Sequence, residues 1–171
     1  MDFGLRGRLN VALAIDSEAW PLAAYRLNHP GVQTIQRNLL LDDPGRVLSD
    51  AGLKHCDLLH ASPPCQAFCQ GSAIKLRYDS RKLCLQSPVW YAAQLKPSFV
   101  IIENVSALET LWQGPYFLDQ LVKGLHGLGY QTDIWNFNAV NYGAFQSRKR
   151  AFVVGWRGNR KPLPPMPTHG N

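Results

Sequence analysis

The sequence has 171 residues, enough for one domain with a hydrophobic core of its own. Hydrophobic residues make up 46% and charged residues 18%, as in a folded globular protein, and no apolar stretch approaches the ~20 residues that span a bilayer. The formal net charge of +6 fits a polyanionic partner, although a solvated basic face would explain the charge equally well.

Short apolar runs alternate with helical patterns along the chain. The runs have the length of buried strands, and the patterns between them place apolar residues at helical spacing. The expected elements are, in chain order, a strand at 11–16, a helix over about 17–28, a short strand within 32–39, a helix opened by residues 42–44, a strand at 57–61, a helix over about 81–95, a strand at 98–103, a helix over about 115–128, and strands at 131–139 and 150–156. This alternation predicts an α/β protein with a doubly wound, mostly parallel sheet.

The C-terminal end of the chain differs in composition from the rest. Residues 162–167 include four prolines, so this stretch cannot hold regular secondary structure. We therefore expect one domain over residues 1–158 and a proline-rich tail or linker over residues 159–171. The N-terminal residues lack the long apolar segment of a signal peptide, which favours a protein that is not secreted.

Residues 62–66 read Ser-Pro-Pro-Cys-Gln and directly follow the strand expected at 57–61. The ends of strands are where α/β proteins place functional groups. Pro63 and Pro64 fix their own φ angles and keep the residues before them out of helical geometry, so Cys65 is held at the end of the strand. This rigidity favours a reactive cysteine over one that only packs.

The other three cysteines are Cys56, Cys69 and Cys84. Because a chain of this size without an export signal more often keeps its thiols reduced, we expect no disulfides. No paired Cys-x-x-Cys spacing is present, so no metal site is predicted. For Cys56 and Cys84 the inference is a buried, inert thiol.

Two further segments complete an ordered set of motifs. Glu-Asn-Val at 103–105 ends the strand expected at 98–103, and Gln-Ser-Arg-Lys-Arg at 146–150 leads into the last strand. Together with the Pro-Pro-Cys loop, these segments resemble the DNA cytosine-5 methyltransferases in both order and spacing. The resemblance covers nearly all of the chain and implies the Rossmann-like fold of S-adenosylmethionine-dependent methyltransferases.

The resemblance also implies a set of catalytic residues. Because C5 of cytosine is a poor nucleophile, the reaction needs a transient covalent bond at C6, and Cys65 as thiolate is the implied nucleophile. Glu103 is implied to contact the N3 and amino edge of the base and to act in its protonated form. Arg150 is assigned to the base and Arg148 to structure or the DNA backbone. An ordinary strand-end acid remains the plain interpretation of Glu103.

Four more residues are implied to bind the substrate or to hold the site. Gln66 follows the nucleophile, Asn104 would hold the loop, and Gln146 opens the basic motif. Cys69 stands where the family frequently has a serine that contacts a phosphate. The implied partner is DNA, and a cytosine inside a duplex must be rotated out of the stack before it can react.

The methyl donor implied by the resemblance is S-adenosylmethionine. Asp16, at the end of its strand, would accept hydrogen bonds from the two ribose hydroxyls. Ser17 would lie against the adenine, Asn38 would accept from the adenine amino group, and Pro63 and Pro64 would line the methionine side. Each of these residues also has a plain interpretation as a strand end, a helix cap, a polar loop residue or a turn proline.

The two ends of the chain depart from the family pattern. Residues 1–5 resemble only the segment after the family's Phe-x-Gly-x-Gly loop, and residues 165–170 resemble the junction before its target recognition domain. We therefore expect a truncated catalytic core without the first strand and the target recognition domain, either as a fragment or as one part of a split enzyme. A second polypeptide is one source of the missing segments.

Two alternatives to a DNA methyltransferase stay open. A noncatalytic DNA-binding partner or decoy would keep the fold without turnover, but the presence of Cys65, Glu103 and Arg150 argues against it. RNA as the substrate has no positive feature in its favour. The resemblance further implies a cytoplasmic protein of bacterial or phage type with a role in restriction-modification.

Overall fold

The structure is a computed structural model that describes residues 7–64, 80–110 and 113–170. The chain forms two compact units, residues 1–56 and residues 57–171. No helix in these described ranges combines the length and the apolar character that crossing a membrane requires.

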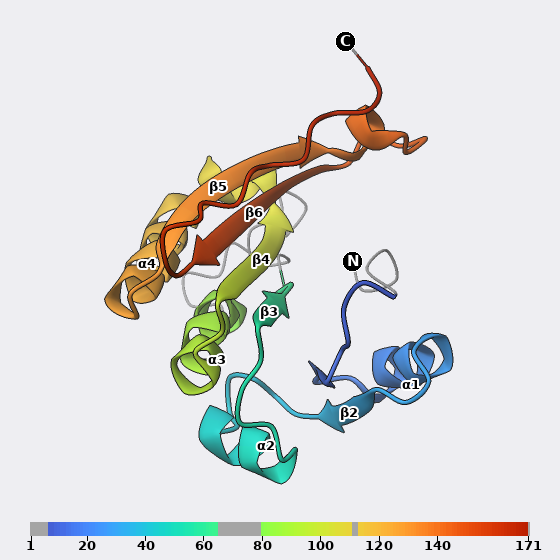
Figure 1. Ribbon diagram of the computed structural model, residues 1–171, viewed down its shortest axis with the longest axis vertical. Coiled ribbons are helices and arrows are strands. Elements are labelled where there is room, and N and C mark those ends of the chain that lie inside the picture. Colours follow the sequence, from blue (N-terminus) through green and yellow to red (C-terminus); the bar gives the residue numbers. More distant parts are fainter. Residues whose placement is uncertain (1–6, 65–79, 111–112, 171) are drawn as a thin grey trace. The chain divides into compact units, whose positions relative to one another are not determined.

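The first unit contains a two-stranded parallel sheet of β1 (Leu13–Asp16) and β2 (Gln33–Gln36), linked by α1 (Ala19–Asn28) (Figure 1). Helix α2 (Pro44–Asp50) follows, and it begins where predicted because Asp43 accepts a hydrogen bond from Arg46 N at 2.8 Å. Asp16 lies opposite Gln36 at the carboxyl ends of the two strands. This edge therefore brings the end of β1 close to the residues that follow β2.

The second unit contains a four-stranded sheet in the order β3-β4-β6-β5. Its strands are β3 (Leu58–Ala61), β4 (Phe99–Val105), β5 (Gln131–Asn138) and β6 (Lys149–Trp156). Strands β3 and β4 are parallel, whereas β6 runs antiparallel to both of its neighbours. The reason is the short connection from β5 to β6 through η5 (Ala139–Tyr142), since only antiparallel neighbours can be joined so briefly. The predicted α/β class is confirmed.

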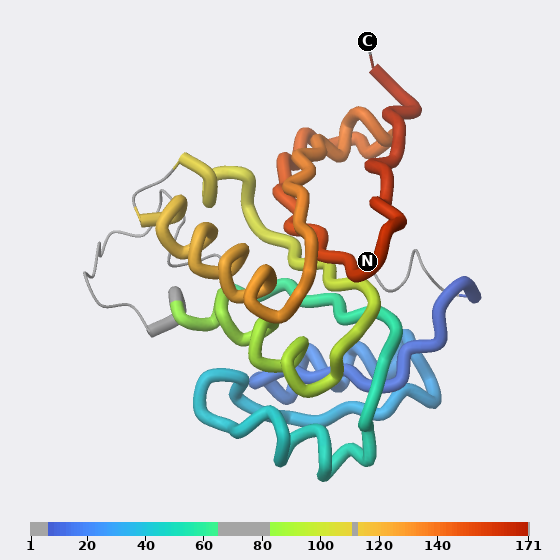
Figure 2. The backbone as a smooth tube through the Cα atoms, turned by 60° about the vertical axis from the view of Figure 1, so that its left-hand side comes forward, coloured from blue at the N-terminus to red at the C-terminus, as the bar shows by residue number. Residues whose placement is uncertain are grey.

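One face of this sheet is covered by helices α3 (Ser87–Leu95) and α4 (Gly114–Gly127), as the green and orange coils of Figure 2 show. Strand β4 alternates between its two faces, so that Val100, Ile102 and Asn104 are buried. The first two pack with Leu121 and Leu125 of α4 in the core. The same alternation turns the neighbouring residues of β4 towards the other face of the sheet.

The helix predicted over residues 81–95 is divided in two, and that prediction was wrong in its first half. Residues Ser80–Gln86 form a 3₁₀ helix, η3, and α3 begins only at Ser87. In a continuous α-helix the ring of Pro88 would meet the carbonyl of Cys84, four residues earlier. Ser87 Oγ instead donates to Cys84 O at 2.8 Å, which satisfies that carbonyl.

The segment after β6 has no regular secondary structure over residues 157–170, as its prolines predicted. It runs back along β5 towards η5 (Figure 1) and is tied down at both ends. Lys161 Nζ lies 2.8 Å from Asp133 Oδ2 of β5. At the other end, Asn141 O accepts from Thr168 N at 3.0 Å and from His169 N at 2.9 Å.

Candidate active site

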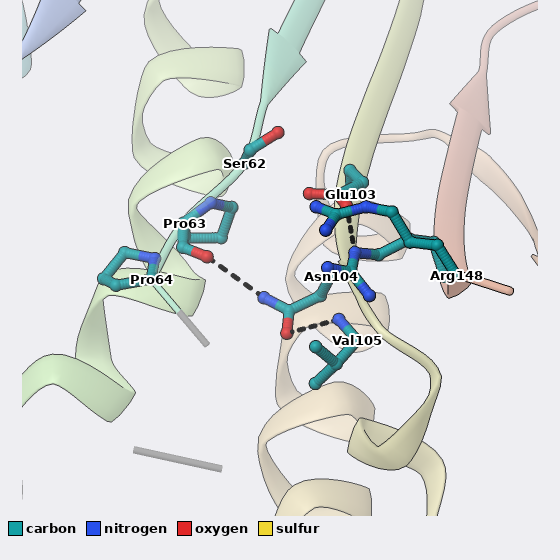
Figure 3. A pocket seen from close by; sticks show the side chains of 8 residues that line it. Ser62, Pro63, Pro64, Glu103, Asn104, Val105 and Arg148 are labelled. Atoms are coloured by element: carbon teal, nitrogen blue, oxygen red, sulfur yellow. Dashed lines mark hydrogen bonds and ion pairs between the residues drawn. The ribbon is translucent and has the colours of Figure 1, made fainter. Parts of the chain in front are cut away.

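A pocket of about 200 Å³ opens in the second unit where the end of β3, the end of β4 and the start of β6 meet (Figure 3). Strands β3 and β4 are parallel and β6 is antiparallel to β4, so these three ends lie at one edge of the sheet. The lining residues are Ser62, Pro63, Pro64, Glu103, Asn104, Val105, Arg148 and Arg150. All three motifs predicted from the sequence contribute to this lining.

Glu103 and Arg150 form an ion pair in this pocket. In the β4–β6 register Val105 lies opposite Arg150 and Glu103 lies opposite Phe152, so Glu103 and Arg150 are diagonal neighbours on one face. Arg150 Nε lies 2.7 Å from Glu103 Oε1. Arg150 Nη1 donates to Lys149 O at 2.8 Å, which fixes the plane of the guanidinium group.

Asn104 points to the opposite face and holds the proline segment in place. Its side chain is 4% exposed. Asn104 Nδ2 donates to Pro63 O at 3.1 Å, and its Oδ1 accepts from Val105 N at 2.9 Å (Figure 3). Both hydrogen bonds are partly shielded from water, and the bond to Pro63 connects the end of β4 to the segment that precedes Cys65.

Arg148 is positioned by Asn138, the last residue of β5. Asn138 Oδ1 accepts from Arg148 N at 2.9 Å and from Ser147 Oγ at 3.3 Å, while its Nδ2 donates to Ser147 Oγ at 3.1 Å. Ala139 N donates to Arg148 O at 3.0 Å. The backbone of the basic motif is therefore fastened to β5 before β6 begins.

The other predicted residues lie away from this pocket or outside the described part of the chain. Cys65, Gln66 and Cys69 lie outside the described residues. Gln146 is exposed on the loop before β6 and does not line the pocket. The predicted cofactor residues of the first unit, Asp16, Ser17 and Asn38, lie at or just beyond the ends of β1 and β2.

Within the first unit, the polar groups at this sheet edge have local partners. Asp16 Oδ1 accepts from Glu18 N at 2.9 Å, and Asn38 Oδ1 accepts from Leu40 N at 3.0 Å. Ser17 O accepts from Gln36 Nε2 at 2.9 Å. The backbone also links the two strand ends, since Arg37 N donates to Asp16 O at 2.9 Å.

Sequence reasoning missed the roles of Ser62, Val105 and Asn138. Ser62 and Val105 belong to the motifs but were given no role from the sequence, whereas in the structure both line the pocket. Asn138 stands outside them, and an asparagine just before a turn was the only signal available. Its contact with Arg148 depends on the pairing of β5 with β6, which a local pattern does not reveal.

The pocket combines a planar cation, a carboxylate and a rigid backbone segment. Such groups suit a flat, polar ring with donors and acceptors on its edge. The chain matches the family model described as C-5 cytosine-specific DNA methylase over residues 2–169. The chain belongs to this family.

Individual members of the family are similar over most of the chain. It is 30% identical over 161 residues to the type II methyltransferase M.AgeI of Thalassovita gelatinovora, covering 92% of this chain and 37% of that protein. It is 32% identical over 167 residues to M.SacI of Streptomyces achromogenes, covering 94% of this chain and 43% of that protein. The chain thus spans about two fifths of the length of these relatives.

The fold of this family member is similar to solved methyltransferase structures. The S. pombe Dnmt2 methyltransferase superposes with a TM-score of 0.70 at 19% sequence identity, covering 95% of this chain and 49% of that one. This likeness confirms the predicted Rossmann-like methyltransferase fold. It concerns the fold alone.

Proposed function

We propose that this chain supplies the catalytic core of a DNA (cytosine-5) methyltransferase, which methylates C5 of a cytosine rotated out of the duplex. Membership of the family supports the class of reaction. The observation that carries the proposal is the Glu103–Arg150 ion pair, which lines one pocket together with the two prolines that precede Cys65.

Cys65 is the proposed nucleophile. Its thiolate adds to C6 of cytosine, forming the S–C6 bond, while the electron pair of the C5–C6 double bond moves into the ring and a proton reaches N3. S-adenosylmethionine, when bound, supplies the electrophilic methyl group. After C5 has been methylated, a base takes the C5 proton, and the electron pair of that C–H bond re-forms the C5–C6 double bond as the S–C6 bond breaks. Cys65 leaves as thiolate, and N3 returns its proton to the Glu103 carboxylate.

Glu103 and Arg150 are the proposed partners of the base edge. Glu103 in its protonated form would give the proton to N3 and contact the amino group. Arg150 uses Nε for Glu103 and Nη1 for Lys149 O, which leaves Nη2 to donate to the base O2. Because a guanidinium group is planar and permanently charged, it stabilises negative charge in the ring without a change in its own protonation.

The ends of β1 and β2 fit the adenosine part of S-adenosylmethionine. Asp16 uses Oδ1 for Glu18 N, and the remaining lone pairs of its carboxylate suit ribose hydroxyls. Asn38 Oδ1 accepts one hydrogen bond and has a second lone pair for an adenine amino group. We assign Ser17 to the adenine side. The assignment of Pro63 and Pro64 to the methionine side rests on the family resemblance alone.

Five further residues are proposed to hold the site in place or to contact the DNA substrate. Asn104 holds the proline segment, and Arg148 orders the pocket wall or meets the DNA backbone. Gln66, Cys69 and Gln146 are proposed to contact DNA. None of these assignments defines the target sequence.

A duplex in which 5-fluorocytosine replaces every cytosine tests the mechanism without knowledge of the target sequence. A base can remove the proton at C5 of cytosine but not the fluorine at C5 of 5-fluorocytosine, so elimination of the thiolate is blocked. With S-adenosylmethionine the S–C6 bond should therefore persist and appear as a covalent protein–DNA complex in mass spectrometry. We expect Cys65→Ala to abolish the complex and Cys56→Ala, the matched control at a cysteine outside the proposed site, to keep it. Attachment through Cys69 would contradict the mechanism. A folded chain that binds duplex and cofactor but forms no complex would favour the noncatalytic DNA-binding alternative.

Calorimetric titration with S-adenosylhomocysteine tests the cofactor assignment separately. We expect binding by the parent chain and a loss of roughly tenfold or more in Asp16→Ala, because two charge-assisted hydrogen bonds disappear. Asp50→Ala is the matched control, since Asp50 is an acid of the same unit outside the proposed site. Equal affinity of the Asp16 variant would contradict the assignment of Asp16 to the ribose.

A further inference from the structure

Phe145 is an aromatic side chain held entirely in solvent, between η5 and β6. Its relative exposure is 109%, the largest among the exposed apolar residues of the described ranges. All residues from 143 to 149 are exposed as well. This loop belongs to the orange segment that joins β5 to β6 in Figure 1. The exposure of Phe145 shows that the described residues leave its ring uncovered.

Both ends of this loop are fastened to η5 and β5. On the N-terminal side, Gly143 takes a φ of +87° and Ala144 N donates to Ala139 O at 3.2 Å. On the C-terminal side, Asn138 Oδ1 accepts from Arg148 N at 2.9 Å and from Ser147 Oγ. The ring therefore stands at the tip of an anchored bend, and ordering it on binding costs little entropy.

Single exposed apolar residues are common on protein surfaces and do not by themselves indicate a binding site. Leu163 and Met166 are exposed by 80% and 81% in the C-terminal segment. Phe145 differs from them because three cations, Arg148, Lys149 and Arg150, follow it within five residues. Both of these arginines line the pocket. An aromatic ring beside a run of cations is the combination that binds unstacked bases and phosphates together.

The distance to the pocket also fits a nucleic acid. Phe145 precedes Arg148 by three positions, so their Cα atoms lie within about 11 Å of each other even in an extended chain. Successive base pairs of a duplex are about 3.4 Å apart, so this reach covers roughly three base pairs.

We propose that Phe145 stacks on a base next to the target cytosine when the duplex is opened. The inference rests on the proposed function, because rotating one cytosine out of the stack leaves the flat faces of its neighbours without a partner. Phe145 covers such a face, while Arg148 and Lys149 lie at the phosphates. The partner is duplex DNA with one base out of the stack.

Fluorescence anisotropy tests the proposal with two labelled duplexes at low salt, one intact and one with an abasic site that leaves a gap in the stack. We expect Phe145→Ala to weaken binding of the gapped duplex roughly 5- to 150-fold, the range for loss of a stacking aromatic. Phe145→Trp should stay within about twofold of the parent chain, since its larger ring still stacks. Leu163→Ala, an exposed apolar control, should bind like the parent chain.

The salt dependence separates stacking from charge. Phe145→Ala removes no phosphate contact, so its slope of log affinity against log salt should equal that of the parent chain. A variant with unchanged affinity, or a Phe145→Leu variant that binds the gapped duplex as tightly as the parent, overturns the stacking proposal alone. Failure of the parent chain to bind either duplex at low salt overturns the DNA part of the proposed function as well.

Discussion

Arg150 of β6 reaches diagonally across to Glu103 of β4, with its Nε 2.7 Å from Oε1 and each side chain 22% exposed. The pair stands on the face of the sheet that points away from the α3–α4 core. Two charges in partial contact with water attract each other more strongly than on an open surface, but salt still screens them. Their contact joins two motifs that are 47 residues apart in the sequence.

Breaking this pair should destabilise the second unit. We expect Arg150→Met to lower the free energy of unfolding by about 1–2 kcal/mol, because a half-buried carboxylate loses a charge-assisted hydrogen bond. Glu103→Gln combined with Arg150→Met should cost less than the sum of the two single variants. Urea denaturation measures all three, and strictly additive losses would show that the contact contributes nothing.

Asn104 should matter more for stability than its size suggests. Asn104→Ala leaves the partly buried Pro63 O and Val105 N without their partners, which costs about 1–3 kcal/mol. The amide of Val105 should exchange faster with solvent in this variant. Ile102→Val, two residues earlier on the same face of β4, is the control, with an expected cost of about 0.5–1.5 kcal/mol. If Val105 exchange were the same in both variants, the hydrogen bond would not be what holds this turn.

Asn138 should control the order of the basic motif. In Asn138→Ala the amide of Arg148 loses its acceptor, so its hydrogen exchange should accelerate roughly tenfold, as expected for loss of one hydrogen bond. Asn138→Asp keeps an acceptor for Arg148 N and should exchange nearly like the parent chain. Ser147→Ala removes the neighbouring hydroxyl but not this bond. Fast Arg148 exchange in the aspartate variant would contradict the proposed role of the side-chain oxygen.

The attachment of the C-terminal segment should weaken in acid. Lys161 Nζ donates to Asp133 Oδ2 and holds the pKa of Asp133 below its ordinary value of 3.8. Burial opposes this lowering, and hydrogen bonds from Trp135 and Ile134 add to it. A lowered pKa in the folded state stabilises the fold above pH 3.8, and this contribution disappears as the pH falls through the folded value.

Lys161→Met tests this attachment directly. Because the pair is largely exposed, we expect a loss of only about 0.2–1 kcal/mol at neutral pH and low salt. The difference from the parent chain should shrink below pH 3.8 and in high salt. Arg160→Met, which removes the neighbouring cation of the same segment but keeps the Lys161–Asp133 contact, should leave the acid limb of the stability curve unchanged. A difference that persists at a pH of about 2, where carboxylates are protonated, would mean that Lys161 acts through packing.

The sequence was informative wherever structure depends on local pattern. The apolar run predicted a strand at 98–103, and the structure has one at Phe99–Val105. The alternating burial along this strand then turns Glu103 and Asn104 to opposite faces. The proline pair after β3 and the N-cap at Asp43 were also visible, because prolines and capping residues act on their immediate neighbours. By contrast, the break in the helix pattern before Pro88 was missed, since helical spacing continued through it.

The sequence by itself determined the α/β class and the order of the elements, because strand length, helical spacing and turn chemistry are local properties. Its ordered motifs also predicted the family, which the family model confirms. Only the tertiary structure decided that Arg150 pairs with Glu103 while Arg148 is fastened to Asn138. That choice depends on the register of β6 between β4 and β5, and register is set by the closure of the hairpin through η5 and by burial of one sheet face.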